Sequence, residues 1–271
     1  MDLTSTKVIK EIFLKYETSA SKRLGQNFLI DKRVLENIVS VADLNKADVV
    51  LEIGPGIGTL TQELAKKAKR VVAVEKDTKM VDILKETLAN FDNVEIVNED
   101  ILKYKVDLDN YKVVANIPYY LTSILIRQLL ENDNPPSNII LTIQKEVAQR
   151  ICAKVPDMNL LAISVQFYAD VKIREHISKN SFWPSPKIDS AVIEIKPSAK
   201  NIKTDFNLFF KIVKAGFSHP RKQLVNNLTS GLKISREVVE KWLSENNIKP
   251  SQRAETLDVK DWISLTNSYK Y

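Results

Sequence analysis

The chain has 271 residues, of which 44% are hydrophobic and 27% are charged, an ordinary balance for a folded globular protein. No apolar run approaches the roughly 20 residues of a membrane span, so we expect no membrane partner. A single cysteine and two histidines exclude a disulfide framework, fit a cytoplasmic protein and predict no metal site.

The positive charge is concentrated near the C-terminus. Residues 1–195 carry 26 Lys and Arg against 27 Asp and Glu, whereas residues 196–271 carry 14 against 7, so the net charges are −1 and +7. This asymmetry indicates a nearly neutral module followed by a basic one that faces a polyanion. A solvated basic surface would give the same count, so charge alone does not establish nucleic-acid binding.

The first predicted element is an amphipathic helix within residues 1–16, which lacks the apolar block of a secretory signal. From residue 48 to residue 144, short apolar runs then alternate with helical segments. The predicted strands are 49–53, 71–74, 94–97, 113–115 and 139–143, and the predicted helices are 59–67, 78–90 and 123–131. This alternation predicts a parallel α/β sheet.

Two more strands are predicted at 162–171 and 190–195, and we expect them to close the sheet as an antiparallel pair. After Pro197 the pattern is helical only. The predicted helices are 205–217, 221–229, 236–246 and 259–268. We therefore expect a domain boundary near residues 197–201, with domains 1–197 and 198–271.

The first strand of the alternating region runs into a glycine-rich loop with Gly54, Gly56 and Gly58, and a helix follows at once. Glycine permits a positive φ and a close approach of the backbone to a ligand. A dinucleotide-binding loop requires Gly or Ala three residues after its second glycine, but Thr59 stands there. The spacing is typical of a loop that binds S-adenosylmethionine. A dehydrogenase remains an alternative only if the glycine spacing is atypical.

Two carboxylates follow the next two strands. Glu75 ends the second strand and is placed to accept hydrogen bonds from both ribose hydroxyls of that cofactor. Asp100 follows the third strand, where it could accept a hydrogen bond from the cofactor's adenine amine. Either residue alone is more often a surface carboxylate. Because ligands bind at the carboxyl ends of parallel strands, the loop and both acids together predict one cofactor site.

The fourth strand ends in Asn116-Ile117-Pro118-Tyr119. One interpretation is purely structural: the segment is a turn that closes a strand. As chemistry, the Asn116 side-chain oxygen and the Ile117 carbonyl could each accept one N–H of an adenine amine, whose lone pair is otherwise delocalised into the ring. Tyr119 would stack on the extruded base. Asn134 lies in a similar Asn-Pro-Pro sequence, but it lacks the aromatic residue and precedes a strand, so we reject it.

An aromatic segment, Phe182-Trp183-Pro184, precedes the last predicted strand. Its prolines stiffen the chain, and Phe182 could cover the adenine face opposite Tyr119. The alternative is that the two aromatic side chains plug the hydrophobic core, which is the commoner role of such a pair.

Together these motifs resemble the ribosomal RNA adenine dimethyltransferase family, over residues 22 to about 257. Besides the Asn116 motif, the resemblance is carried by residues 22–29, 144–148 and 182–192. Segments 217–222 and 253–257 are similar to the housekeeping type that modifies the small ribosomal subunit, although Pro220 stands where that type commonly has Arg.

The resemblance implies a Rossmann-like, S-adenosylmethionine-dependent methyltransferase sheet, mostly parallel with an antiparallel closing strand, and a small all-α C-terminal domain. Residues 1–33 would cap the cofactor, and residues 198–271 would bind RNA. Catalysis is expected at Asn116, Ile117, Pro118, Tyr119 and Phe182. The expected cofactor contacts are Gln26, Asn27, Leu29, Gly54, Gly56, Glu75, Asp100, Ile101 and Asn116.

The implied reaction is dimethylation of two adjacent adenosines in the 3′-terminal hairpin of small-subunit ribosomal RNA, within an assembling 30S particle. We expect Lys22, Arg23, Arg221 and Lys222 to contact RNA phosphates, although each could simply be a solvated surface residue. Two alternatives remain: an Erm-type enzyme, which methylates large-subunit RNA and confers macrolide resistance, and a non-catalytic ribosome assembly factor. A monomer is the default expectation.

Overall fold

The computed structural model describes residues 1–198 and 204–270 and divides the chain into two compact units. The first unit comprises Met1–Ala148 and Asp170–Pro197, and the second comprises Gln149–Ala169 and Ser198–Tyr271. The segment Gln149–Ala169 therefore belongs with the C-terminal helices, which the pattern of apolar residues did not predict. Residues 199–201 of the predicted boundary lie outside the described residues.

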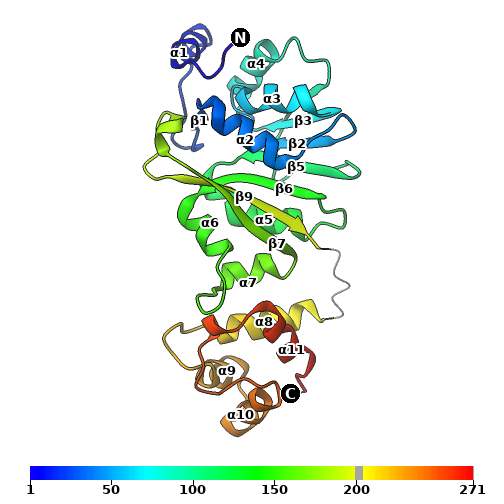
Figure 1. Cartoon of the computed structure of the whole chain (residues 1–271), viewed down its shortest axis with the longest axis vertical. Helices are drawn as coiled ribbons and strands as arrows, with labels where there is room; N and C mark the ends of the chain where they lie inside the picture. The colour runs from blue at the N-terminus through cyan, green and yellow to red at the C-terminus, as the bar shows by residue number, and fades with distance from the viewer. Residues whose placement is uncertain (199–203, 271) are drawn as a thin grey trace. The chain divides into compact units, whose positions relative to one another are not determined.

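A seven-stranded sheet forms the centre of the first unit, in the order β4-β3-β2-β5-β6-β9-β7 (Figure 1). The pairs among β2 to β6 are parallel, and β9 runs antiparallel to β6. The strands are β2 (Val49–Ile53), β3 (Arg70–Glu75), β4 (Val94–Asn98), β5 (Tyr111–Asn116), β6 (Asn138–Gln144), β7 (Ala169–Ile177) and β9 (Ser190–Pro197). The predicted fold class is confirmed. Because the strand order reverses at β2, a crevice is expected where β2 and β5 end.

Helices cover this sheet on its faces. In chain order, those that begin in the first unit are α1 (Thr6–Lys15), α2 (Lys32–Ala42), α3 (Thr59–Lys67), α4 (Thr78–Thr87), α5 (Thr122–Leu130) and α6 (Lys145–Ile151), with short 3₁₀ turns η1 (Tyr119–Leu121) and η2 (Lys179–Ser181). Helices α2 and α3 lie side by side and bury their apolar stripes against the strands (Figure 1). No helix in the described part of the chain is long and apolar enough to cross a membrane.

One predicted strand is wrong. Residues 162–171 were expected to be extended, but α7 (Leu160–Gln166) occupies the first half of the segment and β7 begins only at Ala169. The Asn159 side chain accepts a hydrogen bond from the Ala162 N–H at 3.0 Å and caps the helix. A short apolar run that contains β-branched residues does not distinguish a buried helix from a strand, and here the cap favours the helix.

The N-terminal segment packs onto the first unit through a cluster of apolar side chains from α1, α4 and the segment after α1. Phe13 of α1 contacts Phe28 edge-on, with their ring centroids 5.6 Å apart. A two-stranded sheet holds this segment further, because β1 (Phe28–Leu29) pairs antiparallel with β8 (Phe182–Trp183). The N-terminal segment is thereby joined to a strand from the C-terminal part of the unit's sequence.

The second unit is built from helices. They are α7, α8 (Phe206–Gly216), α9 (Leu224–Leu232), α10 (Arg236–Glu245) and α11 (Val259–Asn267), with the 3₁₀ turn η3 (Ala254–Thr256). Their apolar faces enclose a core in which Phe209, Trp242 and Trp262 are fully buried. This unit contains most of the basic C-terminal region identified from the sequence.

Helices α8 and α9 approach each other closely at Gly231. A Cβ at this position would lie 2.6 Å from the Ala215 Cβ and 3.0 Å from its Cα, which is backbone. We expect Gly231→Ala to lower the free energy of unfolding by about 1–3 kcal/mol, because the helices must move apart. Ser230→Ala, at an exposed position of the same helix, is the control and should change it by less than about 0.5 kcal/mol. Equal values for the two variants in urea unfolding would contradict this packing argument.

Candidate functional site

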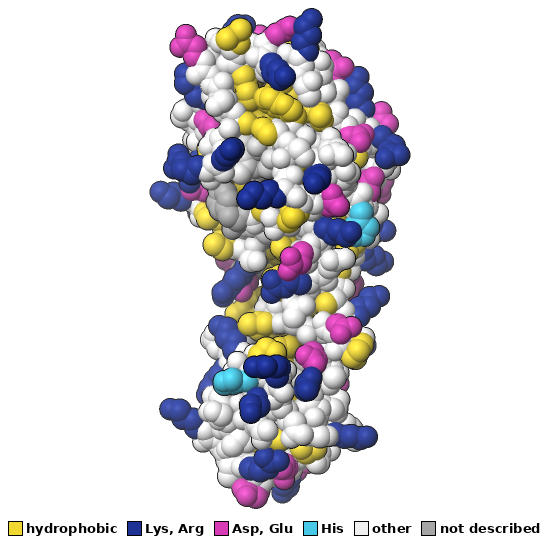
Figure 2. Space-filling model, turned by 90° about the vertical axis from the view of Figure 1, so that its left-hand side faces the viewer, with side chains coloured by type: hydrophobic (Ala, Val, Ile, Leu, Met, Phe, Trp, Pro, Cys, Tyr) yellow, Lys and Arg dark blue, Asp and Glu magenta, His cyan; other side chains and the backbone are white. Residues whose placement is uncertain are grey.

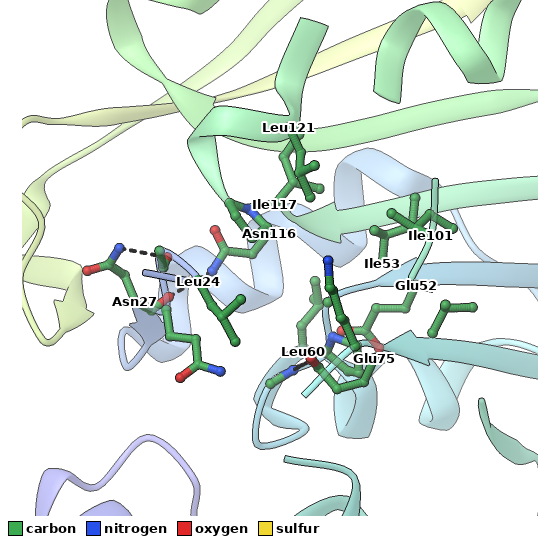
Figure 3. A pocket seen from close by; sticks show the side chains of 18 of the residues that line it. Leu24, Asn27, Glu52, Ile53, Leu60, Glu75, Ile101, Asn116, Ile117 and Leu121 are labelled. Carbon is green, nitrogen blue, oxygen red and sulfur yellow. Dashed lines mark hydrogen bonds between the residues drawn. The ribbon is translucent and has the colours of Figure 1, made fainter. Parts of the chain in front are cut away.

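A pocket lies at the carboxyl ends of β2, β3 and β5, and the segment from Leu24 to Leu29 forms another wall. Figure 3 shows that residues distant in sequence, including Asn27, Glu52, Glu75 and Asn116, meet around it. Except for Phe182, every residue predicted for catalysis or cofactor binding lines this pocket. The sheet therefore brings the motifs together as the alternating pattern predicted.

The glycine loop forms the floor between β2 and α3. Gly54, Gly56 and Gly58 all have positive φ values, of +66°, +62° and +92°. At Gly56, a Cβ would come within 2.8 Å of Phe28 Cε1, so the loop passes closely beneath the N-terminal segment. Both the backbone conformation and this contact require glycine, and the loop leaves backbone exposed toward a ligand.

Glu75 is held in place by the backbone around it. The Gly56 N–H donates to its Oε2 at 3.1 Å, and the Asp77 N–H donates to its Oε1 at 2.8 Å. Burial raises the pKa of Glu75, while these two N–H groups act in the opposite direction. The carboxylate is thus fixed at the end of β3, where it can accept further hydrogen bonds from a ligand's hydroxyls.

Asp100 lies after β4 and is paired at the rim of the pocket. The Lys76 Nζ donates to its Oδ2 at 2.7 Å, and the Leu102 N–H donates to its Oδ1 at 3.1 Å. The hydrogen bond from Lys76 lowers the pKa of Asp100, so its carboxyl is ionised at neutral pH. The neighbouring Ile101 is buried and contributes an apolar wall.

Asn116 ends β5 with its amide orientation set by the N-terminal segment. Its Nδ2 donates to the backbone carbonyl of Asn27 at 3.0 Å. This bond assigns which end of the amide is nitrogen, and it leaves the Oδ1 oxygen to serve as an acceptor. The carbonyl of Asn27 therefore orients the Asn116 amide. The spacing of residues along the sequence could not show this role.

Tyr119 begins the turn η1 and is also held by a polar contact. Its hydroxyl lies 2.8 Å from the Oγ of Ser190, a fully buried residue that starts β9. Burial raises the pKa of Tyr119, so the hydroxyl stays protonated at neutral pH. The contact fixes the ring at the pocket wall, next to Ile117 and Pro118.

Gln26 lines the pocket, but its side chain bonds to protein groups. Its Nε2 donates to Asp77 Oδ2 at 2.9 Å, and its Oε1 accepts from the Ser21 N–H at 2.8 Å. Because Asp77 also donates its N–H to Glu75, Gln26 connects the N-terminal segment to the acid at the end of β3. Leu29, in β1, is buried and contributes apolar surface.

Phe182 does not line the pocket. It is 3% exposed and belongs to the core cluster that contains Leu29 and Val34. In β8 it lies opposite Leu29, so strand pairing directs its side chain into the core. Phe182 therefore packs in the hydrophobic core, as the alternative interpretation of the sequence had it. It does not lie opposite Tyr119 at the pocket.

The four predicted RNA-binding residues are all exposed. Lys22 and Arg23 lie in the turn just before Leu24, which lines the pocket. Arg221 and Lys222 lie between α8 and α9 in the second unit. Figure 2 shows Lys and Arg side chains spread over the viewed surface among fewer Asp and Glu side chains, and such exposed cations could contact a polyanion.

Two buried polar residues of the pocket were not predicted as site residues from the sequence. Glu52 in β2 is 1% exposed, and Thr59 begins α3. Among the described residues, neither Glu52 Oε2 nor Thr59 Oγ1 has a hydrogen-bond partner. Buried polar atoms are rarely left unpaired, so these orphaned atoms fit a pocket built for a polar ligand such as S-adenosylmethionine. The available signal was an acid within a buried strand, two residues before Gly54.

Comparisons with known proteins agree with this arrangement. The family model "Ribosomal RNA adenine dimethylase" matches residues 17–270. A curated relative from Dehalococcoides mccartyi (strain CBDB1), named "Ribosomal RNA small subunit methyltransferase A", is 42% identical over 96% of this chain and 92% of its own length.

Two solved structures are similar. A dimethyladenosine transferase from Plasmodium falciparum has a TM-score of 0.76 and 27% identity, covering 88% of this chain and 95% of its own. The 23S rRNA methyltransferase ErmE also has a TM-score of 0.76, with 26% identity, covering 89% of this chain and 99% of its own.

Proposed function

The chain belongs to the ribosomal RNA adenine dimethylase family, and we propose that it transfers methyl groups from S-adenosylmethionine to the N6 amines of two adjacent adenosines in the 3′-terminal hairpin of small-subunit ribosomal RNA. The product is N6,N6-dimethyladenosine. The observation that carries this proposal is the oriented Asn116 amide beside an acid-lined pocket. The names of the curated relatives favour the small subunit over the Erm-type target.

The cofactor's place follows from the order of the strand ends. Asp100 after β4 would bind the adenine of the cofactor, and Glu75 at the end of β3 would bind its ribose. Gly54 and Gly56 would bind the part of the cofactor beyond the ribose. When bound, S-adenosylmethionine supplies a methyl group on a positively charged sulfur. Asn27, Leu29 and Ile101 would complete the walls, and Gln26 would hold the N-terminal segment closed over them.

The target amine would be aimed by Asn116 and Ile117. The Asn116 Oδ1 and the Ile117 carbonyl accept its two N–H groups, which localises the nitrogen lone pair. Pro118 fixes the turn, and Tyr119 stacks on the extruded base. Positioning supplies most of the acceleration, because the methyl group is already activated. The proton then leaves to water, so no residue is assigned as a general base.

RNA binding would involve both units. Lys22 and Arg23 are proposed to contact phosphates beside the pocket, and Arg221 and Lys222 to do so from the helical unit. We propose that the enzyme acts as a monomer in the cytoplasm, on RNA within an assembling 30S particle. We further propose that the catalytic role belongs to residues 1–197 with their N-terminal cap, apart from Gln149–Ala169, which belongs to the helical unit, and that residues 198–271 of that unit bind RNA.

The target can be tested with radiolabelled S-adenosylmethionine and unmethylated ribosomal subunits. We expect label on two adjacent adenosines near the 3′ end of small-subunit RNA. Label on large-subunit RNA alone would identify an Erm-type enzyme. Cofactor binding without transfer to either subunit would favour the non-catalytic assembly factor and contradict the proposal.

Tyr119 provides a prediction about stacking. We expect Tyr119→Ala to lower kcat/KM for the RNA by about 5- to 150-fold, because base–aromatic stacking contributes about 1–3 kcal/mol. Tyr119→Phe keeps the ring and loses only the contact to Ser190, so it should lower kcat/KM by less than about tenfold. Steady-state kinetics on small subunits measure both. If the Phe variant is as impaired as the Ala variant, the hydroxyl matters more than the stacking face.

A further inference from the structure

Gln26 and Asn27 are neighbours in the chain, and each has a hydrogen bond to a different part of the site. The Gln26 Nε2 donates to Asp77 Oδ2 at 2.9 Å, just beyond the end of β3. The Asn27 carbonyl accepts from Asn116 Nδ2 at 3.0 Å, where β5 ends, and the two asparagines lie close together in Figure 3. One short segment therefore connects the acid side of the pocket to the amide that aims the target amine.

Asp77 is a firm anchor for Gln26. Its Oδ1 caps α4 by accepting from the Lys79 N–H at 3.0 Å, and its own N–H donates to Glu75 Oε1 at 2.8 Å. Its Oδ2 is the oxygen that accepts from Gln26. Because Asp77 holds both Glu75 and Gln26, the position of Gln26 is tied to the acid that is proposed to bind the ribose.

The Gln26 side chain also closes the turn that precedes it. Its Oε1 accepts from the Ser21 N–H at 2.8 Å, and its own N–H donates to the Ser21 carbonyl at 3.1 Å. Gly25, within this turn, has a φ of +64°. After Asn27 the chain enters β1 at Phe28, which is paired with β8. The Asn27 carbonyl thus lies between two anchors, the Gln26 amide on one side and a strand pair on the other.

We propose that Gln26 is a positioning residue for methyl transfer. Its bond to Asp77 fixes the Asn27 carbonyl, and that carbonyl keeps the Asn116 Oδ1 turned toward the target amine. This inference rests on the proposed function, since it requires an amine to be aimed. If the Asn116 amide turned over, its Nδ2 would present a donor to an amine that is itself a donor, and the acceptor would be lost.

The loss of Gln26 should affect chemistry more than cofactor binding. Gln26→Ala removes one hydrogen bond beside the ribose acid, so the affinity for S-adenosylhomocysteine should fall by no more than about tenfold. The rate of methyl transfer should fall by about 10- to 100-fold, because a misplacement of about 1 Å in an aligned site can cost about 100-fold. Titration with S-adenosylhomocysteine measures the first effect and shows that the variant is folded. Single-turnover methylation of small subunits at saturating S-adenosylmethionine measures the second.

A double substitution tests whether Gln26 acts through Asn116. If it does, adding Gln26→Ala to Asn116→Ala should change the single-turnover rate by less than about twofold, because the group that Gln26 positions is already gone. Losses that multiply would show two independent effects and would overturn the inference.

The control for general loosening of the N-terminal segment is Glu86→Ala. Glu86 lies on the same helix as the cap Asp77 and accepts from Lys15 Nζ and from the Tyr16 hydroxyl, both at 2.6 Å. Its replacement frees α1 from α4 but leaves the bond between Gln26 and Asp77, so the single-turnover rate should stay within about twofold of normal. A loss as large as that of Gln26→Ala would mean that any loosening of the segment slows the reaction, and the inference would fail.

An exchange of the two polar groups gives the rescue experiment. Gln26→Glu alone places a second carboxylate against Asp77 and should slow transfer at least as much as Gln26→Ala. Adding Asp77→Asn restores a hydrogen bond with the opposite polarity and the original net charge, and the rate should recover to within about fivefold of normal. No recovery would overturn the inference and leave the proposed function intact. Absence of methylation by the unsubstituted protein would instead overturn the proposed function.

Discussion

Replacing Asn116 by alanine should lower the turnover rate on small-subunit RNA by about 10²–10³-fold, the usual effect of removing one preorganised polar group from a reacting centre. The Asn116 amide is held by the Asn27 carbonyl at 3.0 Å, so its oxygen needs no reorganisation when the target amine arrives. Cofactor affinity should fall by no more than about tenfold, because at most one hydrogen bond to the cofactor is lost. Single-turnover methylation and cofactor titration separate the two effects.

The control for this prediction is Asn134→Ala. Asn134 is exposed, lies in the similar Asn-Pro-Pro sequence, and donates to the Leu108 carbonyl at 2.7 Å, away from the pocket. Its replacement removes one structural hydrogen bond and should leave turnover within about twofold of normal. A large loss of turnover in the Asn134 variant, with normal turnover in the Asn116 variant, would show that Asn134 and not Asn116 acts on the target amine.

Gly56→Ala should lower the free energy of unfolding by about 2–4 kcal/mol and abolish measurable cofactor binding. An alanine at φ +62° is strained by about 1 kcal/mol. Its Cβ would also lie 2.8 Å from Phe28 Cε1, and Phe28 is packed among Phe13, Ile57 and Met80. Because the ring cannot move away freely, overpacking adds about 1–3 kcal/mol. Urea unfolding without cofactor measures the sum.

Gly54→Ala separates the two contributions. Its φ is +66°, nearly that of Gly56, but a Cβ there would meet only Pro118 Cδ at an ordinary 3.8 Å. This variant should therefore lose only the backbone contribution of about 1 kcal/mol. Equal losses of unfolding free energy in the two variants would mean that Phe28 gives way and that the N-terminal segment does not press on the loop.

Much of the site was predictable because it depends on sheet topology. Glu75 and Asp100 follow successive parallel strands, and parallel strands end at the same edge, so their meeting follows from the alternation of elements. The glycine loop was predictable for a similar reason, since its three positive φ values require residues without a Cβ. In these cases local sequence and global fold agree.

Contacts between distant segments were not predictable in the same way. Phe182 was expected at the pocket, but its pairing with Leu29 turns it into the core, and strand register cannot be read from two residues. Glu52 was passed over because a buried strand is normally apolar, and only the structure shows that its oxygen lacks a partner. Helix α7 was mistaken for a strand because its apolar run is too short for periodicity to decide.

The pairing of β1 with β8 also has a consequence for how the protein is made. Asp31, just after β1, accepts a hydrogen bond from the Ser181 hydroxyl 150 residues later, and Ile30 donates its N–H to the Ser181 carbonyl. Because the chain leaves the ribosome N-terminus first, β1 is synthesised long before β8. The wall of the pocket formed by residues 24–29 can therefore close only after about two-thirds of the chain has been made, when the parallel strands of the sheet already exist.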